Sequence, residues 1–131
     1  MKASRTLTVN SVPADATTIT VGSCVVNFQN GAVGANTDCS DNDAKIERNG
    51  GGVSTSSIAT DLRTITNLSG AGHGALTVSG SGTTAIFTTT GAETSATDII
   101  FTDGTSGAIT STANTTGVVG ATAVAQVNTI T

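Results

Sequence analysis

The residues with the clearest potential for chemistry form the segment Asp38-Cys39-Ser40-Asp41-Asn42-Asp43. Carboxylate and amide oxygens that alternate along a loop suit a hard cation such as Ca²⁺. An EF-hand loop beginning at Asp38 would need glycine sixth and glutamate twelfth, where this chain has Asp43 and Asn49. The pattern therefore favours a solvated acidic loop, with Ca²⁺ held by Asp38, Asp41 and Asp43 as the alternative. No other cofactor is expected.

Catalytic patterns are missing from the sequence. His73 is the single histidine, which excludes the usual zinc sites with several histidines and predicts an exposed loop residue. No G-x-S-x-G motif supplies a nucleophilic serine, and the glycines at 50–52 lack the lysine of a phosphate-binding loop. We therefore expect a protein that is not an enzyme.

Cys24 and Cys39 are the two cysteines, and they enclose a short loop rich in Gly, Asn and Asp. A disulfide between them would stabilise the fold by about 3 kcal/mol through loop entropy. Two reduced thiols are the alternative, but an acidic, Thr-rich chain with few lysines favours an oxidising compartment. Two sequons, at Asn67 and Asn114, would accept glycan only in a competent secretory setting.

The composition is typical of a β protein with many turns. Threonine, alanine and glycine dominate, while charged residues make up 11%, against about 25% in an average domain. The net charge of −4 and the five scattered Lys and Arg argue against nucleic acid as a partner. No apolar run approaches the roughly 18 residues of a membrane helix, and the first ten residues do not resemble a signal peptide. The length of 131 residues predicts one β-rich domain over residues 1–131.

Alternation of apolar and polar residues predicts the strands. Gly22-Ser23 and residues 80–82 indicate hairpin turns, and residues 30–43 indicate a loop. Residues 110–120 are weakly patterned. The expected strands are 5–12, 17–21, 24–29, 44–48, 75–79, 83–89, 97–102 and 123–131.

One helix is expected at about residues 56–68, because Ile58, Leu62 and Ile65 form a single apolar stripe. Serines at 54–57 offer N-caps, and Gly70 is a plausible stop. A helix this short must pack on a sheet. We expect its stripe to meet the phenylalanines, which are Phe28, Phe87 and Phe101.

The two ends of the chain carry similar Thr-alternating strands. Val124, Val127 and Ile130 lie in the last of these. One interpretation is that these strands are the ordinary first and last strands of one sheet. The other is that one of them completes a neighbouring copy or repeat, by exchange of a terminal strand, and so builds a chain of domains or a filament.

A set of short sequence features follows in a characteristic order along the chain. They are DATTITVG at 15–22, VVNF at 25–28, a helix at 57–67, ALTV at 75–78 and the strand at 83–90. Over residues 5–110 this order resembles the small Thr/Gly-rich modules of phage tail and virion proteins and of bacterial surface proteins, including appendage and S-layer-like proteins. The resemblance implies an α+β fold with an antiparallel sheet, a structural or adhesive role and no catalytic residues. A second resemblance is to the globular part of a type IV pilin, whose long apolar N-terminal helix this chain lacks.

These observations together predict a mainly β or α+β fold: an antiparallel sheet or small sandwich with one short helix packed on it. The expected function is that of a non-catalytic subunit of an extracellular filament, appendage or virion surface, which packs as a homo-oligomer. The alternative is an adhesin that recognises a glycan or host surface. The absence of Trp and Tyr disfavours that alternative, because sugars usually stack on aromatic side chains.

Overall fold

The computed structural model describes residues 3–31, 37–70, 74–90 and 99–115, which form strands and one short helix. In chain order the elements are β1 (Ser4–Val9), β2 (Thr17–Val21), β3 (Cys24–Gln29), β4 (Asp43–Glu47), α1 (Thr55–Arg63), β5 (Leu76–Ser79), β6 (Thr84–Thr89), β7 (Phe101–Asp103) and β8 (Ile109–Thr115).

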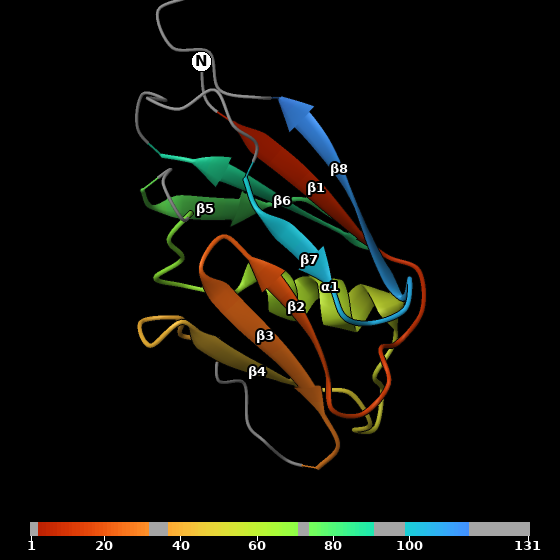
Figure 1. Ribbon diagram of the computed structural model, residues 1–131. Coiled ribbons are helices and arrows are strands. Elements are labelled where there is room, and N and C mark those ends of the chain that lie inside the picture. The colour runs from red at the N-terminus through yellow and green to blue at the C-terminus, as the bar shows by residue number, and fades with distance from the viewer. Residues whose placement is uncertain (1–2, 32–36, 71–73, 91–98, 116–131) are drawn as a thin grey trace, which may run out of the picture.

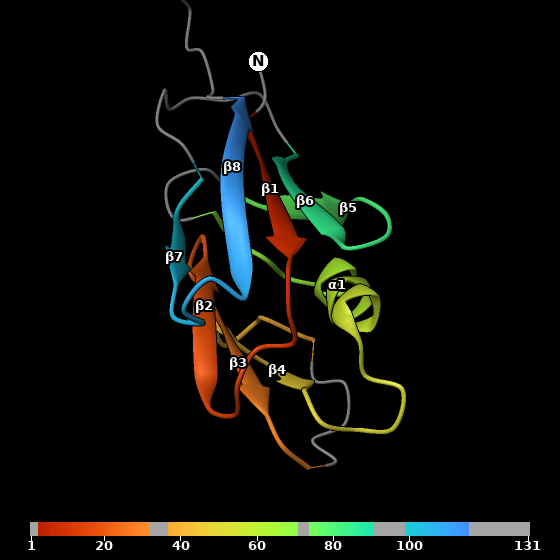
Figure 2. The ribbon, with the colours of Figure 1, turned by 90° about the vertical axis from the view of Figure 1, so that its right-hand side faces the viewer.

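The strands form two four-stranded sheets. Sheet A has the order β5-β6-β1-β8 and sheet B the order β4-β3-β2-β7. Sheet A occupies the upper part of Figure 1 and sheet B the lower part, and Figure 2 shows α1 beside the strands of sheet A. The prediction of a mainly β fold with one short helix is therefore confirmed.

The hairpin that joins β2 to β3 follows the sequence prediction closely. Its two-residue turn is Gly22-Ser23, and Gly22 has a φ of 60°. A side chain at this position would meet the backbone of Ser69 and Gly70. Two reasons therefore require glycine at position 22: the left-handed backbone conformation and the close approach of a second segment of the chain.

Sheet B is not wholly antiparallel, which corrects the prediction. β3 and β4 pair in parallel, with Val25 opposite Asp43 and Gln29 opposite Glu47. Parallel neighbours need a connection that returns to the starting end of the first strand. The chain makes that return before β4, where Cys39 is bonded to Cys24, the first residue of β3.

The helix is shorter than the predicted 56–68 and ends at Arg63. Ser54 caps its start, because its hydroxyl accepts the Ser57 N–H while the Ser57 hydroxyl accepts the Ser54 N–H. Two of the three residues Thr64-Ile65-Thr66 are threonines and all are β-branched, which disfavours further helix. Thr66 instead exchanges backbone hydrogen bonds with the segment Thr37–Cys39.

The core lies between the sheets and α1. Phe28, Phe87, Ile58 and Leu62 are fully buried, and Ile65 is nearly so, although it lies beyond the helix. Phe101 is only half-buried and packs against the margin of this cluster. Helix α1 contacts β6, β1 and β5, so it covers the inner side of sheet A.

Candidate functional site

The outward side of sheet A carries an unusual set of side chains. Along β1 and β6, Leu7, Val9, Ala85 and Phe87 are buried, so the alternate residues face out of the molecule. We call the outward set the hydroxyl face. It consists of Ser4, Thr6, Thr8, Thr77, Ser79, Thr84, Ile86, Thr88, Thr110 and Thr112.

The pairing registers align these side chains in rows across the strands. Thr8 lies between Thr84 of β6 and Thr110 of β8, and Thr6 lies between Ile86 and Thr112. Strands are spaced about 4.8 Å apart, and residues on one side of a strand repeat every ~6.7 Å. The hydroxyl face is therefore a two-dimensional grid of hydroxyl and methyl groups.

The hydroxyl face carries no ionisable side chain, and this distinguishes it from sheet B. On sheet B the edge strand β4 carries Asp43, Lys45 and Glu47, and the Asp43 carboxylate accepts a hydrogen bond from Asn27 Nδ2. Serine and threonine hydroxyls both donate and accept hydrogen bonds, and they stay uncharged at every physiological pH. The face can therefore bind by shape, methyl contact and hydrogen bonding, but it offers no acid, base or activated nucleophile.

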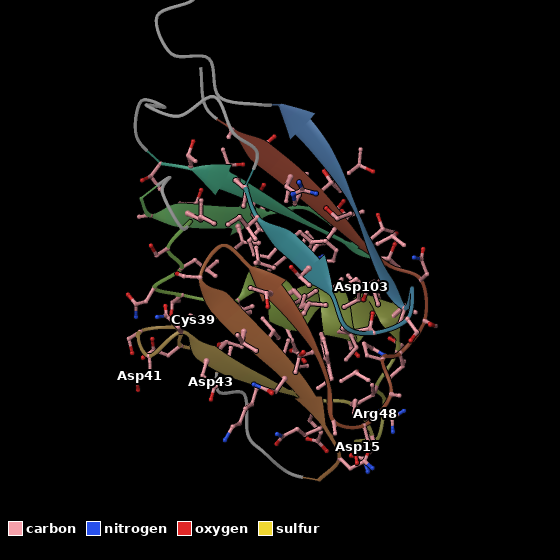
Figure 3. The ribbon with its side chains drawn as sticks, in the orientation of Figure 1. Asp15, Cys39, Asp41, Asp43, Arg48 and Asp103 are labelled. Carbon is pink, nitrogen blue, oxygen red and sulfur yellow. A yellow bond between two sulfur atoms is a disulfide. The ribbon has the colours of Figure 1, made fainter. Side chains whose placement is uncertain are left out.

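Two clusters of hydrogen bonds hold β8 beside β1. Arg5 donates from Nε to the Ile99 carbonyl at 2.7 Å and from Nη1 to Ser111 Oγ at 2.7 Å. In the β7–β8 connection, labelled by Asp103 in Figure 3, the Asp103 carboxylate accepts the N–H groups of Thr105 and Gly107 at 2.6 and 2.9 Å. Burial raises the pKa of Asp103, but these bonds and one from the Thr105 hydroxyl outweigh it and hold that pKa below its usual value.

The acidic loop is organised by hydrogen bonds. Asp38 Oδ1 accepts the Ser40 N–H at 2.9 Å and Asn67 Nδ2 at 2.7 Å, and these bonds lower the pKa of Asp38. Figure 3 shows Asp41 at the margin of the molecule. Among the described residues, no three His, Cys, Asp or Glu side chains are placed to hold a metal ion. The structure thus does not bring Asp38, Asp41 and Asp43 together as Ca²⁺ ligands.

The other predicted residues are placed as follows. Cys24 and Cys39 are buried and form the expected disulfide. Asn67 is exposed in a turn with a φ of 57°. Asn114 belongs to β8. His73 and the terminal residues Val124, Val127 and Ile130 lie outside the described residues.

No family model, curated protein or solved structure matches this chain. Within the described ranges, no helix has the length and apolar character needed to cross a membrane.

Sequence reasoning missed the hydroxyl face and the strand β8. Thr110-Ser111-Thr112 has no apolar alternation, so the residue pattern alone did not indicate a strand. A signal was nevertheless present, since threonines two residues apart also occur at Thr6/Thr8 in β1. That these pairs share one face depends on the registers between distant strands.

Proposed function

We propose that this protein is a non-catalytic structural subunit that assembles with like copies through the hydroxyl face of sheet A. The observation that carries the proposal is the absence of charged side chains from the hydroxyl face, as far as the described residues define it. Ile86 lies among the hydroxyl residues, beside Thr6.

An uncharged face suits contact between identical subunits. In a symmetric contact, a charged residue near the two-fold axis meets its own copy, and such a juxtaposition of like charges costs several kcal/mol. The threonine methyls and Ile86 supply apolar area, and the hydroxyls can bond to one another across the contact. The charged residues that the structure describes lie outside the hydroxyl face, as on the β4 edge of sheet B, and charge of this kind keeps a surface solvated.

The disulfide supports an oxidising location for this assembly. Disulfides persist in secreted proteins and at virion and cell surfaces. We therefore propose that the assembled form is an extracellular filament, an appendage or part of a virion surface.

Electron microscopy and sedimentation velocity over a range of concentrations test the proposal. The wild-type chain should form ordered assemblies, and Ile86→Lys or Thr77→Lys should weaken them about ten-fold or more by placing charge in the contact. Thr102→Lys is the matched control, because Thr102 is an exposed strand threonine of sheet B. Two outcomes would contradict the role of the hydroxyl face. One is a wild-type chain that is monomeric at every concentration, and the other is an assembly that Thr102→Lys weakens as much as Ile86→Lys does.

A glycan array separates this role from that of an adhesin. The assembly proposal expects no specific glycan signal from the wild-type chain. A monomer that binds one glycan, and loses that binding in Ile86→Lys, would establish the adhesin function instead.

A further inference from the structure

The two sheets have four edges, and three of them are poorly suited to pairing with another strand. β5 has four residues and β7 only three. β4 has five residues, of which Asp43, Lys45 and Glu47 are charged. Short strands and charged edges are two of the devices by which natural sheets avoid pairing with other chains.

The fourth edge, β8, is neither short nor charged, and its register with β1 shifts only at its far end, between Arg5–Ala113 and Ser4–Thr115. It is seven residues long and contains no charged residue and no proline. The chain carries no charged side chain anywhere in residues 104–131. β8 is thus the longest of the four edge strands and the one edge of sheet A or B that is neither short nor charged.

The hydrogen-bond phase shows which backbone groups of β8 face outward. The Asn10 N–H donates to the Ala108 carbonyl at 2.8 Å, and the register continues from there through Thr8–Thr110 and Thr6–Thr112. In an antiparallel pair the bonding direction alternates along each strand. Thr110 and Thr112 therefore bond to β1, while the N–H and C=O groups of Ser111 and Ala113 point to the open edge.

These open groups are not used within the described parts of the chain. The first outward N–H of β8, that of Ile109, is satisfied by the Thr105 hydroxyl at 3.1 Å. The described residues provide no such partner for the N–H groups of Ser111 and Ala113. Among the described residues, the ladder is thus blocked at the Ile109 end of β8 and open at Ser111 and Ala113.

We propose that β8 pairs antiparallel with β8 of a second copy. An antiparallel pair of identical strands has two-fold symmetry, so each copy presents the same donors and acceptors to the other. Two uncharged strands meet without repulsion, and their sheets A join into one continuous sheet. The two hydroxyl faces then form one larger face, so this inference rests on the proposed assembly role and identifies its smallest unit as a dimer.

Ser111→Pro and Ser111→Ala are a matched pair of full-chain variants that test the pairing. Both lose the hydroxyl that Arg5 bonds, but only proline also removes the outward N–H. Proline is tolerated on an edge strand whose N–H faces solvent, so the monomer should keep its fold. With Ile86→Lys present in every chain to block contact between hydroxyl faces, sedimentation equilibrium should give twice the chain mass for Ser111 and Ser111→Ala, and at least a ten-fold weaker dimer for Ser111→Pro. Equal dimerisation of the two variants overturns the pairing.

Ala113→Pro repeats the test at the second open N–H, with circular dichroism to verify that each variant is folded. Val127→Pro in the full chain identifies the paired strand. A dimer that survives Val127→Pro supports β8 with β8, whereas a dimer that Val127→Pro abolishes shows that the terminal strand is the partner and overturns this inference.

The outcomes separate this inference from the assembly role. If Ile86→Lys disperses the assemblies while Ser111→Pro leaves them unchanged, the pairing of β8 is wrong and the assembly role stands. If the wild-type chain remains a monomer throughout, both are wrong.

Discussion

Asp103 accepts two hydrogen bonds from Thr105, one from its backbone N–H at 2.6 Å and one from its hydroxyl. The same hydroxyl accepts the Ile109 N–H, which begins β8. These two side chains therefore fix the passage of the chain from sheet B to sheet A.

The first prediction concerns the buried hydroxyl of Thr105. Thr105→Val keeps the shape of the side chain but leaves the Ile109 N–H without its acceptor. We expect the free energy of unfolding to fall by about 1–3 kcal/mol, the cost of an unsatisfied buried donor. Chemical denaturation measures this change. Thr102→Val, at an exposed site on β7, should have little effect, and equal losses in both variants would contradict the argument.

The second prediction concerns pH. Hydrogen bonds hold the pKa of Asp103 below its usual value in the folded state. The stabilisation by the carboxylate is therefore complete above the unfolded pKa of about 3.9 and is lost as the pH falls through the folded pKa. Asp103→Asn should be less stable than wild type at pH 7, and the two should converge in strong acid. A difference in thermal midpoint that does not change between pH 7 and pH 2 would be inconsistent with this linkage.

The third prediction has the opposite sign. Burial raises the pKa of Asp61 on α1, and Glu47 on β4 raises it further. The folded state thus disfavours the charged form, so the chain loses stability as the pH rises through the folded pKa of Asp61. Asp61→Asn should stabilise the protein by about 0.5 kcal/mol at pH 7, a small value because solvent screens this partly exposed group. The gain should vanish below pH ~4, and thermal midpoints of Asp61→Asn and wild type at pH 7 and pH 3 measure it.

The fourth prediction concerns the disulfide. It closes a loop with a sequence separation of 15, for which the loop-entropy model gives about 3 kcal/mol. Reductant should lower the denaturation midpoint of the wild-type chain by a corresponding amount. The double variant Cys24→Ala/Cys39→Ala should already be destabilised and should not respond to reductant. A wild-type midpoint insensitive to reductant under denaturing conditions would count against this contribution.

The fifth prediction concerns the start of the helix. Ser54 forms a reciprocal cap with Ser57, so Ser54→Ala should cost about 1 kcal/mol. Thr55→Ala in the same turn is the control and should cost less, because alanine favours helix. The thermal midpoints of the two variants provide the comparison, and a larger loss in the control would argue against the cap.

The sequence was sufficient to predict features set by neighbouring residues. The hairpin of β2 and β3 follows from Gly22-Ser23 between two alternating strands, and the helix follows from its apolar stripe with a serine cap. The parallel pairing of β4 could not be predicted, because its direction depends on the path of the connection that precedes it. The predicted end of the helix was wrong because Ile65 continues the apolar stripe in the sequence. In the structure Ile65 is buried, but it lies in the segment that follows the helix.

The candidate site was harder to predict than the fold. The alternation in β1 indicates that Thr6 and Thr8 face outward, but it does not indicate which strands lie beside them. That Thr84 and Thr110 flank Thr8 depends on pairing across most of the length of the chain. The face therefore exists only in the folded protein.

The pairing of Ser4 with Thr115 places the start of β1 and the end of β8 at the same corner of sheet A. Tension applied to the chain at these two points would break the hydrogen bonds between β1 and β8 one after another. It would not load all of these hydrogen bonds in shear at the same time. Such a geometry resists little force. If the protein forms the proposed fibre, tension on that fibre would therefore have to pass through the contacts between subunits and not along the backbone.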